Sequence, residues 1–151
     1  MRAGGTADTA REILTSFTTW AVVGASPESH KPASFVPAFL QSRGYRVIPV
    51  NPTYAGQRIF GETCYPDLTS IPASDGVEVV DLFRRSHLVL PHVDEACEIG
   101  AKAIWMQAGI VNDDAAAVAR AAGMLVVMDR CPKVDIPTLL GNSFRAGHAA
   151  A

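Results

Sequence analysis

The sequence contains no long hydrophobic run and no block of like charges. Its apolar stretches fall well short of the roughly 18 residues of a membrane-spanning helix. Residues 1–19 are polar and lack the apolar core that a signal peptide requires. Lysine and arginine are scattered along the chain, and the formal net charge is −2. These absences argue against a membrane protein and against a nucleic-acid-binding surface.

Cysteine is also scarce. The sequence has three cysteines, Cys64, Cys97 and Cys131, which are far apart and form no CxxC pair. This spacing favours neither a zinc site nor a disulfide framework, so we expect a protein of the reducing cytoplasm. With 151 residues, the chain is long enough for a single domain, 1–151, with a full hydrophobic core.

Apolar segments that read as strands alternate with segments that read as helices. The predicted strands are 20–23, 46–50, 77–82, 103–106 and 125–128, and the predicted helices are 7–18, 34–44, 88–100 and 112–122. This alternation predicts a Rossmann-like three-layer α/β/α fold with a parallel five-stranded sheet. We expect the strand order 3-2-1-4-5, counted along the chain. Ligands should then bind beyond the carboxyl ends of the strands, at the switch point between strands one and four.

The loop after the first predicted strand is suited to a phosphate group. Gly24, Ala25 and Ser26 form a tight small-residue turn before a helix, whose first backbone N–H groups can hold an anion. Lys31 adds a positive charge, and Ser34 is the expected helix N-cap. The loop lacks the second and third glycines of a GxGxxG motif. The structural alternatives are an ordinary strand-to-helix turn and a solvated Lys31.

The residues after the second and third predicted strands indicate which kind of phosphate-containing ligand is favoured. The second strand ends in Asn51 and Pro52, where an NAD site normally has a carboxylate for the ribose. NAD is therefore disfavoured, while the proline offers an apolar edge to an adenine. Phe83 and Arg84, followed by Arg85, suit a ligand with several phosphates.

A further pair of residues follows the fourth predicted strand. Gln107 can donate and accept hydrogen bonds, and Gly109 permits close backbone approach. Both residues would border the expected switch point.

At these positions the chain resembles a known family over about residues 20–140. It is similar to the small bacterial and archaeal CoA-binding proteins, and to the CoA-binding domains of the succinyl-CoA synthetase alpha subunit and of ADP-forming acyl-CoA synthetases. The matching blocks are 22–26, 44–52, 61–66, 80–84, 105–110 and 129–133.

The resemblance implies CoA or acyl-CoA as the ligand and assigns a part of it to each candidate residue. Gly24, Ala25 and Ser26 would hold the pyrophosphate, with Lys31 and Ser34 near phosphates. Asn51 and Pro52 would border the adenosine, and Phe83 and Arg84 the adenine and the 3′-phosphate. Gln107 and Gly109 would face the pantetheine arm.

No set of residues in the sequence forms a recognisable catalytic group. Asp81 and Asp129 read as structural hydrogen-bonding residues. Cys131, between Arg130 and Lys133, has two readings, a thiol able to form a mixed disulfide and a packed small hydrophobe.

We therefore expect a CoA-binding carrier, sensor or regulatory module without catalysis of its own. The expected ligand is a small molecule, and a protein partner or a homo-oligomer stays open. An NADP-linked enzyme or redox sensor on the same fold is the alternative. A synthetase subunit whose catalytic partner is another chain is disfavoured by the absence of a second domain.

Overall fold

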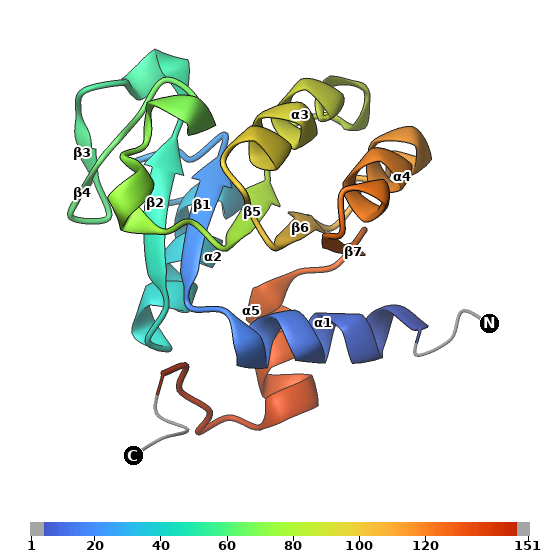
Figure 1. The fold of residues 1–151 in the computed structure, drawn as a ribbon. Coiled ribbons are helices and arrows are strands. Elements are labelled where there is room, and N and C mark those ends of the chain that lie inside the picture. Colours follow the sequence, from blue (N-terminus) through green and yellow to red (C-terminus); the bar gives the residue numbers. More distant parts are fainter. Residues whose placement is uncertain (1–4, 148–151) are drawn as a thin grey trace.

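The fold is built on one sheet of five parallel strands, seen near the centre of Figure 1. The computed structural model describes residues 5–147. The strands of the sheet are β1 (Thr19–Val23), β2 (Arg46–Val50), β5 (Val79–Leu82), β6 (Ala103–Met106) and β7 (Leu125–Val127). Each lies within two residues of the segment predicted from the sequence, and the Rossmann-like α/β class is confirmed.

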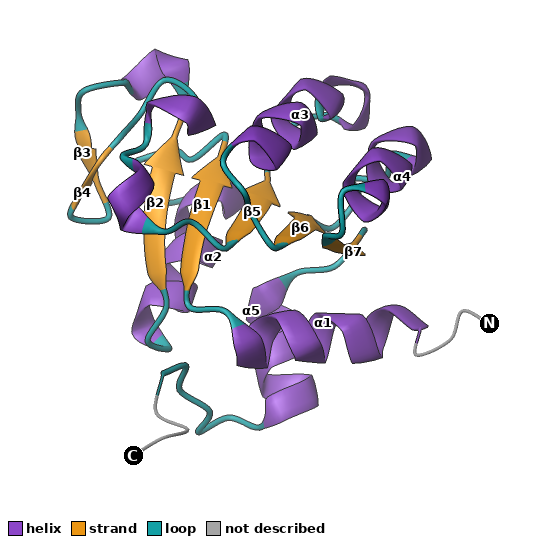
Figure 2. Cartoon of the chain, in the orientation of Figure 1, coloured by secondary structure: helices purple, strands orange, loops and turns teal. Residues whose placement is uncertain are grey.

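Helices cover both faces of the sheet, which gives the three layers visible in Figure 2. The helices are α1 (Gly5–Ser16), α2 (Pro32–Ser42), α3 (Leu90–Glu98), α4 (Asp113–Ala121) and α5 (Pro132–Asp135), which runs into a π-helical turn, Ile136–Leu140. Short 3-10 turns lie at Pro52–Tyr54, Leu68–Ser70, Ala73–Asp75 and Ser86–Leu88. None of the helices within residues 5–147 is both long and apolar enough to span a bilayer.

Each strand sends apolar side chains to both faces, because both faces are covered by helices. In β1, for example, Ala21 and Val23 pack in the cluster under α3 and α4, while Trp20 and Val22 face α1 and α2. Helix α4 contains five alanines, and three of them, Ala115, Ala116 and Ala119, are fully buried against the sheet.

The predicted strand order 3-2-1-4-5 is wrong in one respect. The sheet runs β2-β1-β5-β6-β7, so the third long strand, β5, pairs with β1 and not with β2. Counted along the five predicted strands, the order is 2-1-3-4-5. The switch point therefore lies between β1 and β5, and the loops that follow these two strands face each other across it.

A short hairpin explains why β5 does not pair with β2. Strands β3 (Arg58–Ile59) and β4 (Glu62–Thr63) form an antiparallel pair beside the outer edge of β2. Phe60 and Gly61, both at positive φ, form its two-residue turn. Just beyond β4, Tyr65 pairs with Val50 at the end of β2. With this edge covered, the chain crosses to the free edge of β1.

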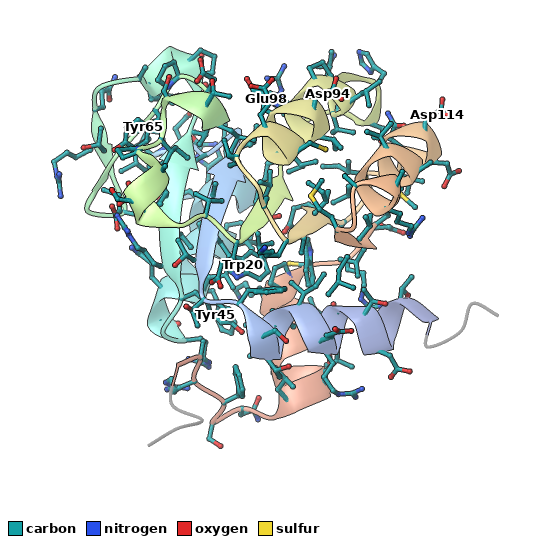
Figure 3. All side chains as sticks on the ribbon, in the orientation of Figure 1. Trp20, Tyr45, Tyr65, Asp94, Glu98 and Asp114 are labelled. Atoms are coloured by element: carbon teal, nitrogen blue, oxygen red, sulfur yellow. The ribbon has the colours of Figure 1, made fainter. Side chains whose placement is uncertain are left out.

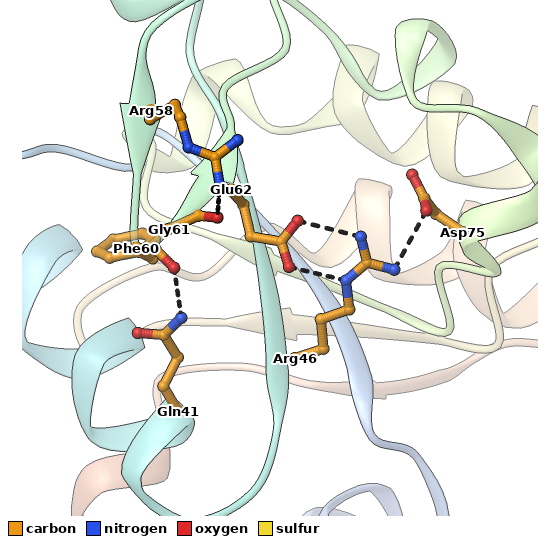
Figure 4. Close-up of polar contacts among 7 residues, drawn as sticks. All are labelled: Gln41, Arg46, Arg58, Phe60, Gly61, Glu62 and Asp75. Atoms are coloured by element: carbon orange, nitrogen blue, oxygen red, sulfur yellow. Dashed lines mark hydrogen bonds and ion pairs between the residues drawn. The ribbon is translucent and has the colours of Figure 1, made fainter.

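Side chains attach the hairpin to the body of the domain (Figure 4). The Arg46 guanidinium at the start of β2 makes a two-pronged contact with the Glu62 carboxylate, at 2.9 and 3.0 Å, and reaches Asp75 at 3.2 Å. On the other side, the Gln41 amide of α2 donates to the Phe60 carbonyl at 2.7 Å. The hairpin thus has contacts to β2 and to α2.

Aromatic residues lie between the sheet and α1, where Figure 3 labels Trp20 and Tyr45. The Trp20 ring meets Tyr45 edge-on at 5.6 Å and Trp105 at 5.5 Å. The Tyr45 hydroxyl donates to the Leu14 carbonyl at 2.6 Å. Because this ring is buried among apolar groups, the pKa of Tyr45 is raised.

Candidate ligand-binding site

A cavity of about 940 Å³ opens at the carboxyl edge of the sheet. Its walls come from the loops after β1, β2, β5 and β6, from the first turns of α2, and from Cys131 after β7. This is the position at which α/β sheets bind ligands, around the switch point between β1 and β5. Its volume lies within the range of ligand pockets.

Gly24 brings the first loop close to the loop after β5. Its φ is +88°, and a Cβ atom there would lie 2.6 Å from the Phe83 carbonyl oxygen. Only glycine therefore fits this crossing without distortion. The Gly24 N–H donates to the Val50 carbonyl at 2.8 Å, which ties the ends of β1 and β2 together.

The other two residues of this loop differ in position. Ser26 lines the cavity, and its hydroxyl oxygen accepts the Glu28 N–H at 3.0 Å while its own N–H donates to the Ala33 carbonyl. Ala25 is fully buried and packs in the core, outside the cavity wall. Its carbonyl instead accepts the Asn51 amide, at 2.9 Å.

The start of α2 opens onto the cavity. Pro32 occupies the first helical position, where its missing N–H costs nothing, and Lys31 is the N-cap residue without a side-chain capping bond. The prediction that Ser34 caps this helix is therefore wrong. Ser34 lies inside the helix, is buried, and does not line the cavity. No acidic residue occupies the first turn, which leaves the positive end of the helix dipole unopposed.

Lys31 lines the cavity and is paired within its own loop. Its ammonium lies 2.9 Å from the Glu28 carboxylate, and both side chains are about half exposed. The hydrogen bond and the charge attraction raise the pKa of Lys31 and lower that of Glu28. The Tyr54 hydroxyl also reaches Glu28, at 3.4 Å.

Asn51 lines the cavity with its amide already engaged. The Nδ2 group donates to the Ala25 carbonyl, and Oδ1 accepts the Thr53 N–H at 2.9 Å. Pro52 is exposed and lies outside the wall. Thr53 and Tyr54 line the cavity in its place, and sequence reasoning did not single them out. The sequence feature that could have identified them is their position directly after the end of a strand.

The loop after β5 supplies an aromatic ring and two cations. Phe83, Arg84 and Arg85 all line the cavity, and the Phe83 N–H continues the ladder to the Val23 carbonyl at 2.9 Å. Arg84 is half-buried and lies near His92 on α3. Burial is the main cause that lowers the pKa of His92, and the positive charge of Arg84 adds to it.

The loop after β6 forms the opposite wall. Gln107 and Gly109 both line the cavity. Gln107 is 4% exposed, and its Oε1 has no hydrogen-bond partner among residues 5–147. The Gly109 N–H is occupied, because it donates to the Asp129 carboxylate at 2.7 Å. Asp129 holds this contact from a positive φ of 59°.

Asp81 departs from its expected role. It is fully buried on β5, and neither carboxylate oxygen has a hydrogen-bond partner in the part of the chain described. Burial raises the pKa of Asp81 well above its usual value, because the charged form is disfavoured away from water. The prediction of a hydrogen-bonding role is wrong for Asp81 and confirmed for Asp129.

The structure thus gathers eight of the predicted residues in one cavity wall. They are Gly24, Ser26, Lys31, Asn51, Phe83, Arg84, Gln107 and Gly109. Ala25, Ser34 and Pro52 lie nearby in the chain but outside the wall. The described residues contain no group of three or more His, Cys, Asp or Glu side chains placed to hold a metal ion.

Comparison with known proteins agrees with this geometry. The family model described as a CoA binding domain matches residues 18–137. The chain belongs to the CoA-binding domain family. The match spans β1 to the π-helical turn and includes every loop that walls the cavity.

Two relatives of similar length match most of the chain. The uncharacterized protein YneT of Bacillus subtilis (strain 168) is 35% identical over 125 residues, which cover 82% of this chain and 89% of YneT. The structure of a hypothetical protein from Pyrococcus horikoshii OT3 matches with a TM-score of 0.84 and 40% identity, covering 91% of this chain and 94% of that one.

A larger enzyme contains a similar domain. An acetyl-coenzyme A synthetase from Ca. Korarchaeum cryptofilum matches with a TM-score of 0.66 and 27% identity. The match covers 78% of this chain but only 26% of the synthetase. The similarity therefore concerns one domain of that enzyme.

Proposed function

We propose that this protein binds CoA or an acyl-CoA in the cavity at the carboxyl edge of its sheet, as a cytoplasmic module without catalysis of its own. The observation that carries the proposal is the distribution of charged and neutral residues over the cavity wall. The chain that forms this wall belongs to the CoA-binding domain family. The loops after β1 and β5 supply cations and a helix start, and the loop after β6 supplies neutral groups.

The charged side suits the phosphates. The first turn of α2, the Ser26 hydroxyl and the Lys31 ammonium follow β1, and Arg84 and Arg85 line the same cavity from the loop after β5. A pyrophosphate can accept hydrogen bonds from a helix start, and an arginine can hold a further phosphate with two parallel bonds. CoA has both a pyrophosphate and a 3′-phosphate.

The region after β2 suits an adenosine without a carboxylate grip on its ribose. Asn51 stands where an NAD site has an acid, and its amide is occupied by loop contacts. Tyr54 and Phe83 provide aromatic surface beside it, and the half-exposed Phe35 adds to the same wall. Base stacking on such surfaces does not need a ribose carboxylate.

The neutral side suits the pantetheine arm. Gln107, Ala108, Gly109 and Ile110 form this wall, and Cys131 adjoins it. The Gln107 Oε1, which has no partner within the described part of the chain, is an acceptor that an amide N–H of the arm would satisfy.

The cavity wall also supports a binding role over a catalytic one. Among the described residues that line it there is no aspartate, glutamate or histidine. General acid–base chemistry relies mainly on those side chains. His30 and His87, in neighbouring loops, are exposed to solvent.

A thermal-shift series with CoA, acetyl-CoA, NAD, NADP and ATP tests the proposal. A ligand at 100 times its dissociation constant stabilises the fold by about 2.7 kcal/mol, which is readily measured. We expect CoA or acetyl-CoA to raise the melting temperature most. A shift with NADP and none with CoA would favour the alternative, an NADP-linked protein that uses the same arginines.

A further inference from the structure

Cys131 lies in the wall of the cavity, on the neutral side. It is partly exposed, whereas Cys64 is buried with its thiol against the Asn51 carbonyl, and Cys97 packs against the core under α3. Burial raises the pKa of the Cys64 thiol, which reduces its reactivity. Of the three cysteines, Cys131 is the one in the cavity wall.

Two further features of the cavity wall indicate what kind of ligand it would bind and how that ligand would lie. Gln107 is a cavity-wall residue, 4% exposed, whose Oε1 has no partner among residues 5–147. A bound molecule with an N–H or O–H group would satisfy that oxygen. Secondly, the cations Lys31, Arg84 and Arg85 come from the loops after β1 and β5, whereas the loop after β6, which the Gly109–Asp129 hydrogen bond ties to the segment before Cys131, carries no charge. A ligand whose phosphates contact these cations would have its uncharged end left for the loop after β6 and for Cys131, which line the same cavity.

The backbone holds Cys131 firmly in this wall. The preceding residue, Arg130, accepts the Trp105 indole N–H at 2.8 Å, and its guanidinium grips the buried Asp135 carboxylate at 2.7 and 3.0 Å. The Cys131 carbonyl accepts the N–H groups of Val134 and Asp135, and Pro132 follows directly. The thiol thus projects from a fixed segment, which lowers the entropic cost of a reaction in the cavity.

We propose that Cys131 forms a mixed disulfide with the thiol end of CoA bound in the cavity, so that the protein reads the thiol–disulfide state of this ligand. The inference rests on the proposed function. The co-reactant is CoA disulfide, the oxidised form of the ligand. The Cys131 thiolate attacks one sulfur, a Cys131–CoA disulfide forms, and the disulfide between the two CoA halves breaks. The departing CoA thiolate takes up the proton that Cys131 lost, so atoms and electrons balance.

Mass spectrometry of the intact protein after incubation with CoA disulfide tests the inference. We expect one CoA adduct per chain, reversed by dithiothreitol. Cleavage before aspartate separates the three cysteines and leaves Cys131 in the segment 129–134, so the wild-type protein itself locates the adduct. Cys131→Ser should lose the adduct, whereas Cys97→Ser should retain it.

Two comparisons show whether binding directs the reaction. At equal concentration, glutathione disulfide should react at least about tenfold more slowly, because it gains no effective concentration from the cavity. An excess of desulfo-CoA, which cannot form the bond, should suppress the adduct. An adduct on Cys64 or Cys97 instead, or equal rates with the two disulfides, would overturn the inference.

Binding of reduced CoA is measured in parallel. Binding without a Cys131 adduct would overturn this inference alone and leave the proposed function standing. Absence of binding would overturn both.

Discussion

Gly24 is the residue at which the fold and the cavity depend on each other most directly. Its missing side chain lets the loop after β1 pass close to Phe83, whose carbonyl oxygen would lie only 2.6 Å from a Cβ atom at this position. The same residue turns the chain toward the start of α2. The closeness of the two loops therefore follows from one glycine.

Gly24→Ala should lower the free energy of unfolding by at least about 1–3 kcal/mol, because it combines a strained φ with a backbone clash. Gly123→Ala is the matched control, since Gly123 has the same φ of +88° and open space around it. Urea denaturation compares the two variants. Equal losses of stability would show that the contact with Phe83 carries no weight.

Arg84 is the cation that we assign to the 3′-phosphate. Arg84→Ala should weaken CoA binding about tenfold or more, in line with the loss of a charge-assisted hydrogen bond. Dephospho-CoA, which lacks the 3′-phosphate, should lose much less affinity. Calorimetric titrations of both ligands measure this difference, with the exposed Arg120 on α4 replaced by alanine as the control. Equal losses for both ligands would reject the assignment.

Asp81 gives the fold a distinct dependence on pH. Its folded-state pKa is raised, so the folded protein retains a proton that the unfolded chain releases above about pH 4. Stability therefore falls by up to about 1.4 kcal/mol per pH unit from there until the folded-state pKa is reached.

Asp81→Asn removes this proton and should flatten the dependence. The stability of the variant relative to the wild type should rise between pH 4 and pH 7, as measured by denaturant unfolding at several pH values. Asp94→Asn, on the exposed side of α3, provides the comparison at a solvated carboxylate. A difference between Asp81→Asn and wild type that stays constant with pH would contradict the account.

At the level of elements, the strands and the longer helices follow from local patterns. Runs such as Val47–Val50 are apolar on both faces because helices cover both faces of the sheet. The helix predicted from residue 112 starts there, with Asn112 as the N-cap whose side chain accepts the Ala115 N–H at 2.9 Å. The cap at Ser34 was not, because Pro32 starts α2 two residues earlier and needs no N–H partner.

The strand order depends on contacts between residues that are distant in the sequence. Local sequence patterns therefore could not predict it. The hairpin of β3 and β4 is set by two-residue strands and by Arg46 reaching Glu62, sixteen positions away. Nothing near β2 in the sequence reveals that its outer edge is covered. The same applies to Asp81, whose burial without a hydrogen-bond partner among residues 5–147 is not visible in its neighbouring residues.

The contact between Arg46 and Glu62 should contribute measurably to the attachment of the hairpin. A double-mutant cycle with Arg46→Ala and Glu62→Ala should give a coupling free energy of about 0.5–1 kcal/mol, the upper part of the range for partly exposed pairs. The pair Arg11–Asp8, a single 3.1 Å contact on α1, is the control and should couple more weakly. Equal coupling in the two pairs would argue against this role of the hairpin contact.

At the scale of the whole molecule, the sheet, the family match and the cavity converge on one edge. The sequence predicted this edge through the loops at 24–31, 51–52, 83–84 and 107–109, although it misplaced the switch point by one strand. The predicted location still coincides with the cavity. The loops after β1, β2, β5 and β6 all lie at the carboxyl edge of the parallel sheet, in whichever order the strands are arranged.

Isothermal titration calorimetry with CoA measures whether the cavity at the carboxyl edge of the sheet binds this ligand. We predict a saturable heat with one CoA per chain, which NADP at the same concentration does not reproduce. Absence of a saturable signal with CoA and acetyl-CoA, or saturable binding of NADP alone, would contradict the central claim.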